Sequence, residues 1–450
     1  MEQDMTRGNP LSVIFMFTLP LAIGNIFQQL YNMADTIIVG RFVGADALAA
    51  VGSTGTIMFL LTGFAQGITA GFSVLTAQRF GAGKKDAVKQ SVTNGILLSI
   101  IGAILLTVSG CAIMDPLLHL MNTPDDIFDM AYTYISLISL GMIANVFYNL
   151  FSSYLRAVGN SKAPLFFLVF SACLNVGLDL FFIVVLKMGV AGAAWATNLS
   201  QAISALLCIV YIYCKVPALV PEKKHWRLTA GDTRYQMQMG IPMALQFAIT
   251  SSGTMIMQSA INLFGSEAVA AYTAACKVHS LLTQGMVAMG QTMAVYSGQN
   301  YGKGDYGRIR AGVKAALIIE FIYSVVSAVA VSLLLGVTLG LFFSGDVDLT
   351  AMMPWARTYI TICTLFYIPL STIFIFRNTM QGCGYGFLPM MGGVVELVAR
   401  MLVAMIAMRV HSYALSCFCD PAAWISAGLF TGVSYLFVMK KIKATLSPKG

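Results

Sequence analysis

Long apolar segments recur from one end of the chain to the other, and they restrict its fold more than any other feature. Each covers about 20 to 30 residues, which is enough for a helix to cross the hydrocarbon core of a bilayer. Strands of a membrane barrel would alternate apolar and polar residues over about ten positions, and the sequence lacks that pattern. Charged residues make up 10% of the 450 residues, against about 25% in a soluble domain. The sequence therefore predicts an all-α membrane protein.

Turn and charge signals divide the apolar segments into twelve expected transmembrane helices. An even number of spans puts both termini on one side of the membrane. Most of the 27 lysines and arginines fall in loops on that side, which predicts cytoplasmic termini in a multi-pass protein of the cell inner (plasma) membrane. The expected spans are 12–40, 48–78, 91–114, 130–155, 163–186, 190–213, 236–264, 268–298, 313–343, 356–381, 387–408 and 421–439.

The two halves of the chain resemble each other at a shift of 221 to 225 residues. Each half holds six spans, so the second half starts from the same side as the first. This predicts two parallel, pseudo-symmetric six-helix bundles: a lobe at 1–213, a cytoplasmic linker at 214–234 and a lobe at 235–450. Two such bundles around a central path are typical of alternating-access transporters. The matched segments are 19–20 with 241–242, 43–50 with 264–271, 78–83 with 299–304, and 156–164 with 381–389.

Motifs for catalysis or nucleotide binding do not occur in a functional form. Gly81 to Lys84 resembles the end of a phosphate loop, but Gln78 and Lys85 stand where that motif needs Gly and Ser or Thr. The basic residues are spread over short loops, and the nine cysteines lack metal-ligand spacing. We therefore expect a monomer in the lipid bilayer that acts on small-molecule substrates, without ATP, nucleic acid, a cofactor or enzymatic activity.

Four acidic residues fall inside expected spans, where a charged side chain costs about 2.5–3.5 kcal/mol. Asp35 shares the first span with Gln28 and Asn32, which recur at helical spacing and form a polar stripe. Such a stripe indicates either the wall of a water-filled cavity or a hydrogen-bonded seam between helices. Glu320 has little polar company on its helix, and we expect a structural role for it.

A cation site is predicted from three spans. Asp179 lies four residues after Asn175, so both side chains project from one face of the fifth span. Together with Asp35 and Thr197 they offer the oxygen ligands that suit Na⁺. A pair of nearby carboxylates also suits a proton, because the two groups titrate together. The sequence leaves the ion open.

Further polar and hinge residues complete the predicted machinery. Glu396 and Arg400 stand four residues apart and can neutralise each other or contact substrate; both alternatives stay open. Pro20 and Pro242 occupy matched positions inside expected helices and are predicted hinges, with a static kink as the alternative. The expected substrate-cavity residues are Gln28, Asn32, Asn149, Gln201, Gln284, Glu396 and Arg400.

The chain resembles the multidrug and toxic compound extrusion (MATE) transporters, most closely their prokaryotic branches. The similarity covers nearly the whole chain and rests on the length, the two six-span lobes, the stretch 33–36 followed by Gly40, the turn 156–160 and the Asn175–Asp179 pair. It implies an antiporter that expels varied, often cationic and amphipathic compounds in exchange for inward Na⁺ or H⁺. It also implies an N-terminal cation site made of Asp35, Asn175, Asp179 and Thr197.

The sequence departs from part of this family, and one rival interpretation remains. Some relatives carry functional acids in their seventh and tenth spans, whereas 236–264 and 356–381 contain none. We therefore do not expect a second-lobe cation site of that type. The rival is a flippase for a lipid-linked precursor, which would need a large basic cavity, and only Lys277 and Arg400 are expected cations within spans.

Overall fold

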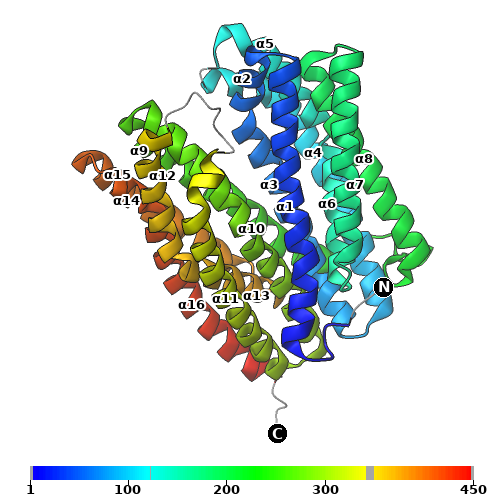
Figure 1. Ribbon diagram of the computed structural model, residues 1–450. Coiled ribbons are helices and arrows are strands. Elements are labelled where there is room, and N and C mark those ends of the chain that lie inside the picture. The colour runs from blue at the N-terminus through cyan, green and yellow to red at the C-terminus, as the bar shows by residue number, and fades with distance from the viewer. Residues whose placement is uncertain (1–3, 122, 341–348, 447–450) are drawn as a thin grey trace. The chain divides into compact units, whose positions relative to one another are not determined.

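The computed structural model describes residues 4–121, 123–340 and 349–446, and these residues contain helices and no strands. Helices occupy the described residues of all twelve expected spans, and residues 341–343 of the ninth lie outside the described part of the chain; the predicted all-α membrane fold is confirmed (Figure 1). Eight helices are long and apolar enough to cross a membrane, and two bent helix pairs raise this number to ten. The remaining two spans correspond to the long helices α9 and α10, whose Gln, Ser and Thr residues lower their hydropathy.

By its internal contacts the chain forms two compact units. Unit 1 consists of Met1–Asp4 and Ile23–Phe247, and unit 2 of Met5–Ala22 and Ala248–Gly450. The first part of α1 thus belongs to unit 2, and the first part of α9 belongs to unit 1. The predicted lobes at 1–213 and 235–450 describe the sequence repeat and stay a prediction.

Unit 1 is built around α3, which packs against α4 and α6, while α8 packs against α6 and α7. Two glycines of α3 allow the first part of α9 to approach closely. A Cβ atom at Gly67 would lie 2.6 Å from the carbonyl oxygen of Met243, and one at Gly71 would lie 2.6 Å from the nitrogen of Gly240. The helices of this unit are α1 (Pro10–Phe42), α2 (Ala45–Ser53), α3 (Gly55–Gly81), α4 (Lys85–Leu120), α5 (Asp125–Leu140), α6 (Met142–Ala157), α7 (Lys162–Asp179), α8 (Gly189–Lys215) and the start of α9 (Ala230–Ile261).

In unit 2, α10 packs against α11, α12 and α13, and α14 runs beside α16 (Figure 1). Its largest core joins these helices around the buried side chains of Tyr359, Tyr367 and Trp424. Besides the remainder of α1 and α9, the helices of this unit are α10 (Ser266–Lys303), α11 (Tyr306–Gly340), α12 (Leu349–Leu365), α13 (Tyr367–Gly382), α14 (Phe387–Val410), α15 (Tyr413–Cys417) and α16 (Cys419–Leu446).

The backbone repeats itself where the sequence repeat predicts. The fourth span of each half is a bent pair, α5–α6 at 46° and α12–α13 at 50°. Glycines with positive φ also occupy matched turns, because only glycine adopts this conformation without strain. The pairs are Gly44 (130°) with Gly265 (87°), Gly83 (70°) with Gly304 (83°), and Gly159 (83°) with Gly384 (92°).

Candidate functional site

Two carboxyl groups from separate helices meet in unit 1. Asp35 lies in the second half of α1, and Asp179 is the last residue of α7. Their side chains are electrostatic neighbours, and Asp179 is fully buried. A carboxylate has no hydrogen to donate, so two carboxyl groups bond to each other only when a proton lies between them. A metal cation can take the place of that proton.

Two tyrosines that the sequence interpretation did not single out border the acid pair. Tyr31 precedes Asp35 by one turn of α1, and its side chain lies beside Gln201 of α8. Tyr134 of α5 is buried and is an electrostatic neighbour of both acids, as is Tyr31. The four-residue spacing of Tyr31 and Asp35 was visible in the sequence, whereas no pattern in α5 linked Tyr134 to α1.

The other two predicted cation-coupling residues are Asn175, one turn before Asp179 on α7, and Thr197 of α8. The amide of Asn175 donates to Thr197 Oγ1 at 3.5 Å, and both side chains are buried. Asn175 stands four residues before Asp179 and therefore shares its face of α7. The fold thus gathers all four predicted residues in one region of unit 1, and cation binding by them stays a prediction.

The backbone changes its winding directly after Asp179. The α-helical turns of α7 end there, and Leu180–Val185 form a π-helical segment before α8 begins at Gly189. Wider π turns shift the register of the following side chains and occur frequently at functional sites. The last carboxyl group of α7 thus lies at the junction between the α-helical turns and the π segment.

The predicted substrate-cavity residues divide between the two units. Gln28 and Asn32 of α1 have exposed side chains in unit 1. The amide of Asn149 donates to the carbonyl oxygen of Asn145 at 2.9 Å, and Gln201 contacts Tyr31 as described above. The remaining three residues, Gln284, Glu396 and Arg400, belong to unit 2.

Arg400 has a different partner from the one considered in the sequence. Its Nε donates to Asp420 Oδ1 at 2.8 Å, and no ion pair joins it to Glu396 in the described part of the chain. The helices α14 and α16 pack together, which brings the carboxylate of Asp420 to the guanidinium. The expected last span starts at residue 421, but α16 begins at Cys419, and Asp420 is buried. Glu396 is a further electrostatic neighbour of Arg400, so the ion pair with Asp420 adds a partner that the sequence did not suggest, and both alternatives for Glu396 stay predictions.

The residues around Arg400 and Asp420 in unit 2 leave little room around the guanidinium group. A Cβ atom at Gly253 of α9 would lie 2.8 Å from Arg400 Nη1, so the side chain of Arg400 lies against the bare backbone there. Glu396 and Arg400 are 5% and 4% exposed, and each keeps one buried polar atom without a hydrogen-bond partner. His279 is an electrostatic neighbour of Asp420 and bonds to the hydroxyl of Tyr367 at 3.0 Å.

Both predicted hinge prolines lie just before the point where their helix passes from one unit to the other. Pro20 precedes the boundary after Ala22 in α1, and Pro242 precedes the boundary after Phe247 in α9. Each helix is continuous in the structure. A proline removes one backbone hydrogen bond, which makes these positions the weakest points of the two helices. Bending there stays a prediction.

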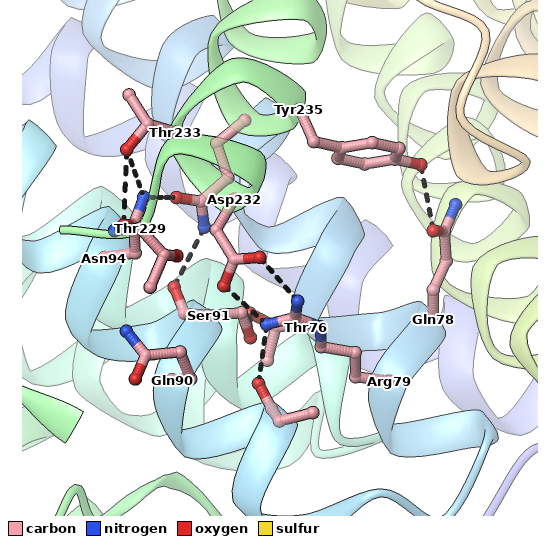
Figure 2. Close-up of polar contacts among 12 residues, drawn as sticks. Thr76, Gln78, Arg79, Gln90, Ser91, Asn94, Thr229, Asp232, Thr233 and Tyr235 are labelled. Atoms are coloured by element: carbon pink, nitrogen blue, oxygen red, sulfur yellow. Dashed lines mark hydrogen bonds and ion pairs between the residues drawn. The ribbon is translucent and has the colours of Figure 1, made fainter. Parts of the chain in front are cut away.

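A network of polar side chains fixes the start of α9 within unit 1 (Figure 2). Arg79 donates two hydrogen bonds to the carboxylate of Asp232, at 2.7 and 2.6 Å. The amide of Asn94 donates to Gln236 Oε1 at 2.9 Å, and Tyr235 donates to Gln78 Oε1 at 2.9 Å. The sequence did not reveal this network, because its members come from three segments that are distant along the chain.

The repeat partners of Gln78 and Arg79 hold the start of the chain in unit 2. Gln299 Oε1 accepts a hydrogen bond from the backbone nitrogen of Met5 at 2.9 Å. Asn300 Nδ2 donates to the carbonyl oxygen of Met5 at 3.4 Å. Arg308 adds hydrogen bonds to the carbonyl oxygens of Met5, Arg7 and Gly8. The matched positions therefore have matched roles: Gln78 and Arg79 anchor the start of α9, and Gln299 and Asn300 anchor the segment before α1.

Comparisons with known proteins agree with this architecture. The MatE family model matches residues 20–181 and 242–406. The probable multidrug resistance protein YpnP of Bacillus subtilis is 32% identical over 68% of this chain and 68% of its own length. The probable multidrug resistance protein NorM of Thermotoga maritima is 24% identical over 95% of this chain and 90% of its own. A crystal structure of MATE in complex with MaL6 shares the fold with a TM-score of 0.89 at 23% identity, covering 98% of both chains.

Proposed function

The chain belongs to the MatE family of membrane transporters, and from this premise we propose that it exports varied, often cationic and amphipathic small molecules. Two relatives bear names that describe probable multidrug resistance proteins, which supports this class of substrate. We further propose that export is driven by exchange for inward H⁺ or Na⁺. The observation that carries this second part is the contact between the carboxyl groups of Asp35 and Asp179.

The acid pair can couple cation binding to the position of α1. With a proton or Na⁺ between them, the carboxyl groups of Asp35 and Asp179 attract a common cation and hold α1 against α7. Without it, two negative charges face each other in a medium of low dielectric constant and repel strongly. Since Gln28 and Asn32 lie on the same stretch of α1 as Asp35, departure of the cation changes the surface that a substrate meets.

Transport requires that the cation and the substrate favour different conformations of the protein. The cation gradient then drives the cycle through this difference in affinity. We place the chain in the inner (plasma) membrane with both termini in the cytoplasm, on the basis of the loop charges. The flippase alternative needs free cations to hold a pyrophosphate group, and the ion pair of Arg400 with Asp420 weighs against it.

Uptake measurements in proteoliposomes test the proposal. Purified protein would be reconstituted and offered a panel of cationic dyes under an imposed Na⁺ gradient, an imposed pH gradient, or neither. We expect dye accumulation that depends on one of the two gradients, which also identifies the ion. Equal accumulation without any gradient would contradict exchange, and transport of lipid-linked pyrophosphates but of no dye would favour the flippase.

A further inference from the structure

One acidic side chain of unit 2 stands apart from the ion pairs described above. Glu320 lies in the middle of α11 and is 2% exposed, and its Oε2 atom is buried without a hydrogen-bond partner in the described structure. One turn later, Ser324 is 1% exposed, and its hydroxyl is likewise buried without a partner. A carboxyl oxygen and a hydroxyl on the same face of one helix therefore both lack a partner.

The helices around α11 bring no cation to Glu320. The helix contacts α10, α12, α13 and α16, and no Lys, Arg or His of their described residues is an electrostatic neighbour of this carboxyl group. The titratable group that faces it is Tyr323, whose hydroxyl donates to the carbonyl oxygen of Leu282 at 2.6 Å. An ionised carboxylate without a counter-charge is very costly in such surroundings, so the group needs a bound cation.

The surroundings favour a proton over a metal ion. A hard metal cation takes about six oxygen ligands, and here one carboxyl group and one serine hydroxyl are available on the same face. The described residues contain no group of three or more His, Cys, Asp or Glu side chains that could hold a metal. A proton needs only one acceptor, and the resulting hydroxyl of Glu320 can donate to Ser324 Oγ. When the proton leaves, the Ser324 hydroxyl can rotate and donate to the carboxylate.

We propose that Glu320 and Ser324 form a second proton-binding site, in unit 2, whose proton exchanges during the transport cycle. This differs from the structural role expected from the sequence, where only the lack of polar neighbours on α11 was visible. The site is independent of the Asp35–Asp179 pair in residues and location. Its part in transport rests on the proposed function, whereas the binding of a proton by Glu320 does not.

Infrared difference spectroscopy of the purified full-length protein in lipid tests the proposal directly. A protonated carboxylic acid absorbs separately from a carboxylate, and its band shifts in D₂O when the proton exchanges. We expect the wild-type protein to show such a band, Glu320→Gln to lose the component that Glu320 contributes beside that of the Asp35–Asp179 pair, and Ser324→Ala to keep that component at a shifted frequency. Ser324→Ala retains the acid and so tests the site even if Glu320→Gln fails to fold. The matched control Glu222→Gln, at an exposed cytoplasmic acid, should leave the band unchanged.

Two outcomes would overturn the proposal. An identical carboxylic-acid band in wild type and Glu320→Gln would show that Glu320 is ionised. A band that forms only when Na⁺ is removed would show a metal site instead. In proteoliposomes, Glu320→Gln should still transport dye but should move fewer protons per dye molecule. Unchanged proton stoichiometry would refute the role in the cycle, and loss of transport in Asp35→Asn with the band intact would separate the two sites.

Discussion

The two units bury acidic side chains in opposite ways. In unit 1, Asp35 faces another acid, Asp179, so the pair is stable only with an added cation between its members. In unit 2, Asp420 faces Arg400, a cation that belongs to the chain itself. In our proposal, an exchangeable cation offsets the cost of burying charge at Asp35 and Asp179, whereas the fixed cation Arg400 offsets it at Asp420. Of these two pairs, only Asp35–Asp179 is proposed to respond to an ion gradient, and the following predictions test this difference.

The largest effect should come from removing one member of the acid pair. Asp35→Asn and Asp179→Asn should each lower gradient-driven dye efflux at least about 100-fold, because the remaining single carboxyl group no longer has a partner with which to share a cation. Efflux from cells that express each variant measures this loss. The matched control is Asp86→Asn at an exposed position near the start of α4, which should transport like wild type. Normal efflux in Asp35→Asn would contradict the assignment.

The opposite pattern is expected for the fixed pair in unit 2. Arg400→Gln or Asp420→Asn alone should lower the free energy of unfolding by about 3–5 kcal/mol, because each leaves a buried charge without its partner. The double variant should lose less than the sum of the two single losses. Thermal unfolding in detergent measures all three proteins. Asp35→Asn should not be destabilised in this assay, since it removes the repulsion between Asp35 and Asp179 that exists without a bound cation. Equal destabilisation by substitutions in the two pairs would contradict the proposed difference between them.

A smaller loss of stability is expected at the start of α9 in unit 1. Asp232→Asn keeps the shape of the side chain but removes the charge that Arg79 binds with two hydrogen bonds. Because both side chains retain some contact with solvent, we expect a loss of about 2 kcal/mol in the free energy of unfolding. The same unfolding assay measures it. An unchanged unfolding temperature would show that Arg79 does not stabilise the start of α9.

The smallest effect concerns the linker at 214–234, whose exposed ion pairs should weaken both at low pH and at high pH. Hydrogen bonds from Lys224 lower the pKa of Asp86, and those from Lys89 lower the pKa of Glu222. The same contact with Asp86 raises the pKa of Lys224. The acids therefore lose their contribution as pH falls through their lowered pKa values, and Lys224 loses its contribution as pH rises through its raised value.

Hydrogen exchange of the linker segment measures this pH dependence. We expect the backbone amides of Lys223–His225 to be best protected near neutral pH, and less protected in acid and in strong base after correction for the intrinsic exchange rate. Glu222→Gln is the matched variant, and it should weaken the acid limb of the profile. A flat profile in the wild-type protein would show that these exposed pairs do not hold the linker.

The sequence predicted the membrane fold well, because length and apolarity alone define a span. It also named Asp35 and Asp179, since helical spacing on each span marked them as polar exceptions. It failed at Asp420, which lies one residue outside the expected last span, and consequently missed the ion pair of Arg400 with Asp420. Tyr134 and the Arg79–Asp232 pair were missed for another reason. Their contacts join helices that are distant along the chain, and no periodic pattern records which faces meet.

The central claim is that Asp35 and Asp179 share the cation that a substrate displaces. The direct measurement is cation release from purified protein in detergent when a transported dye is added, followed with a pH indicator for H⁺ and with ²²Na⁺ for sodium. We expect the wild-type protein to release one of these cations on dye binding, and Asp35→Asn and Asp179→Asn to bind dye without that release. Equal release of that cation from wild type and from both variants would contradict the account.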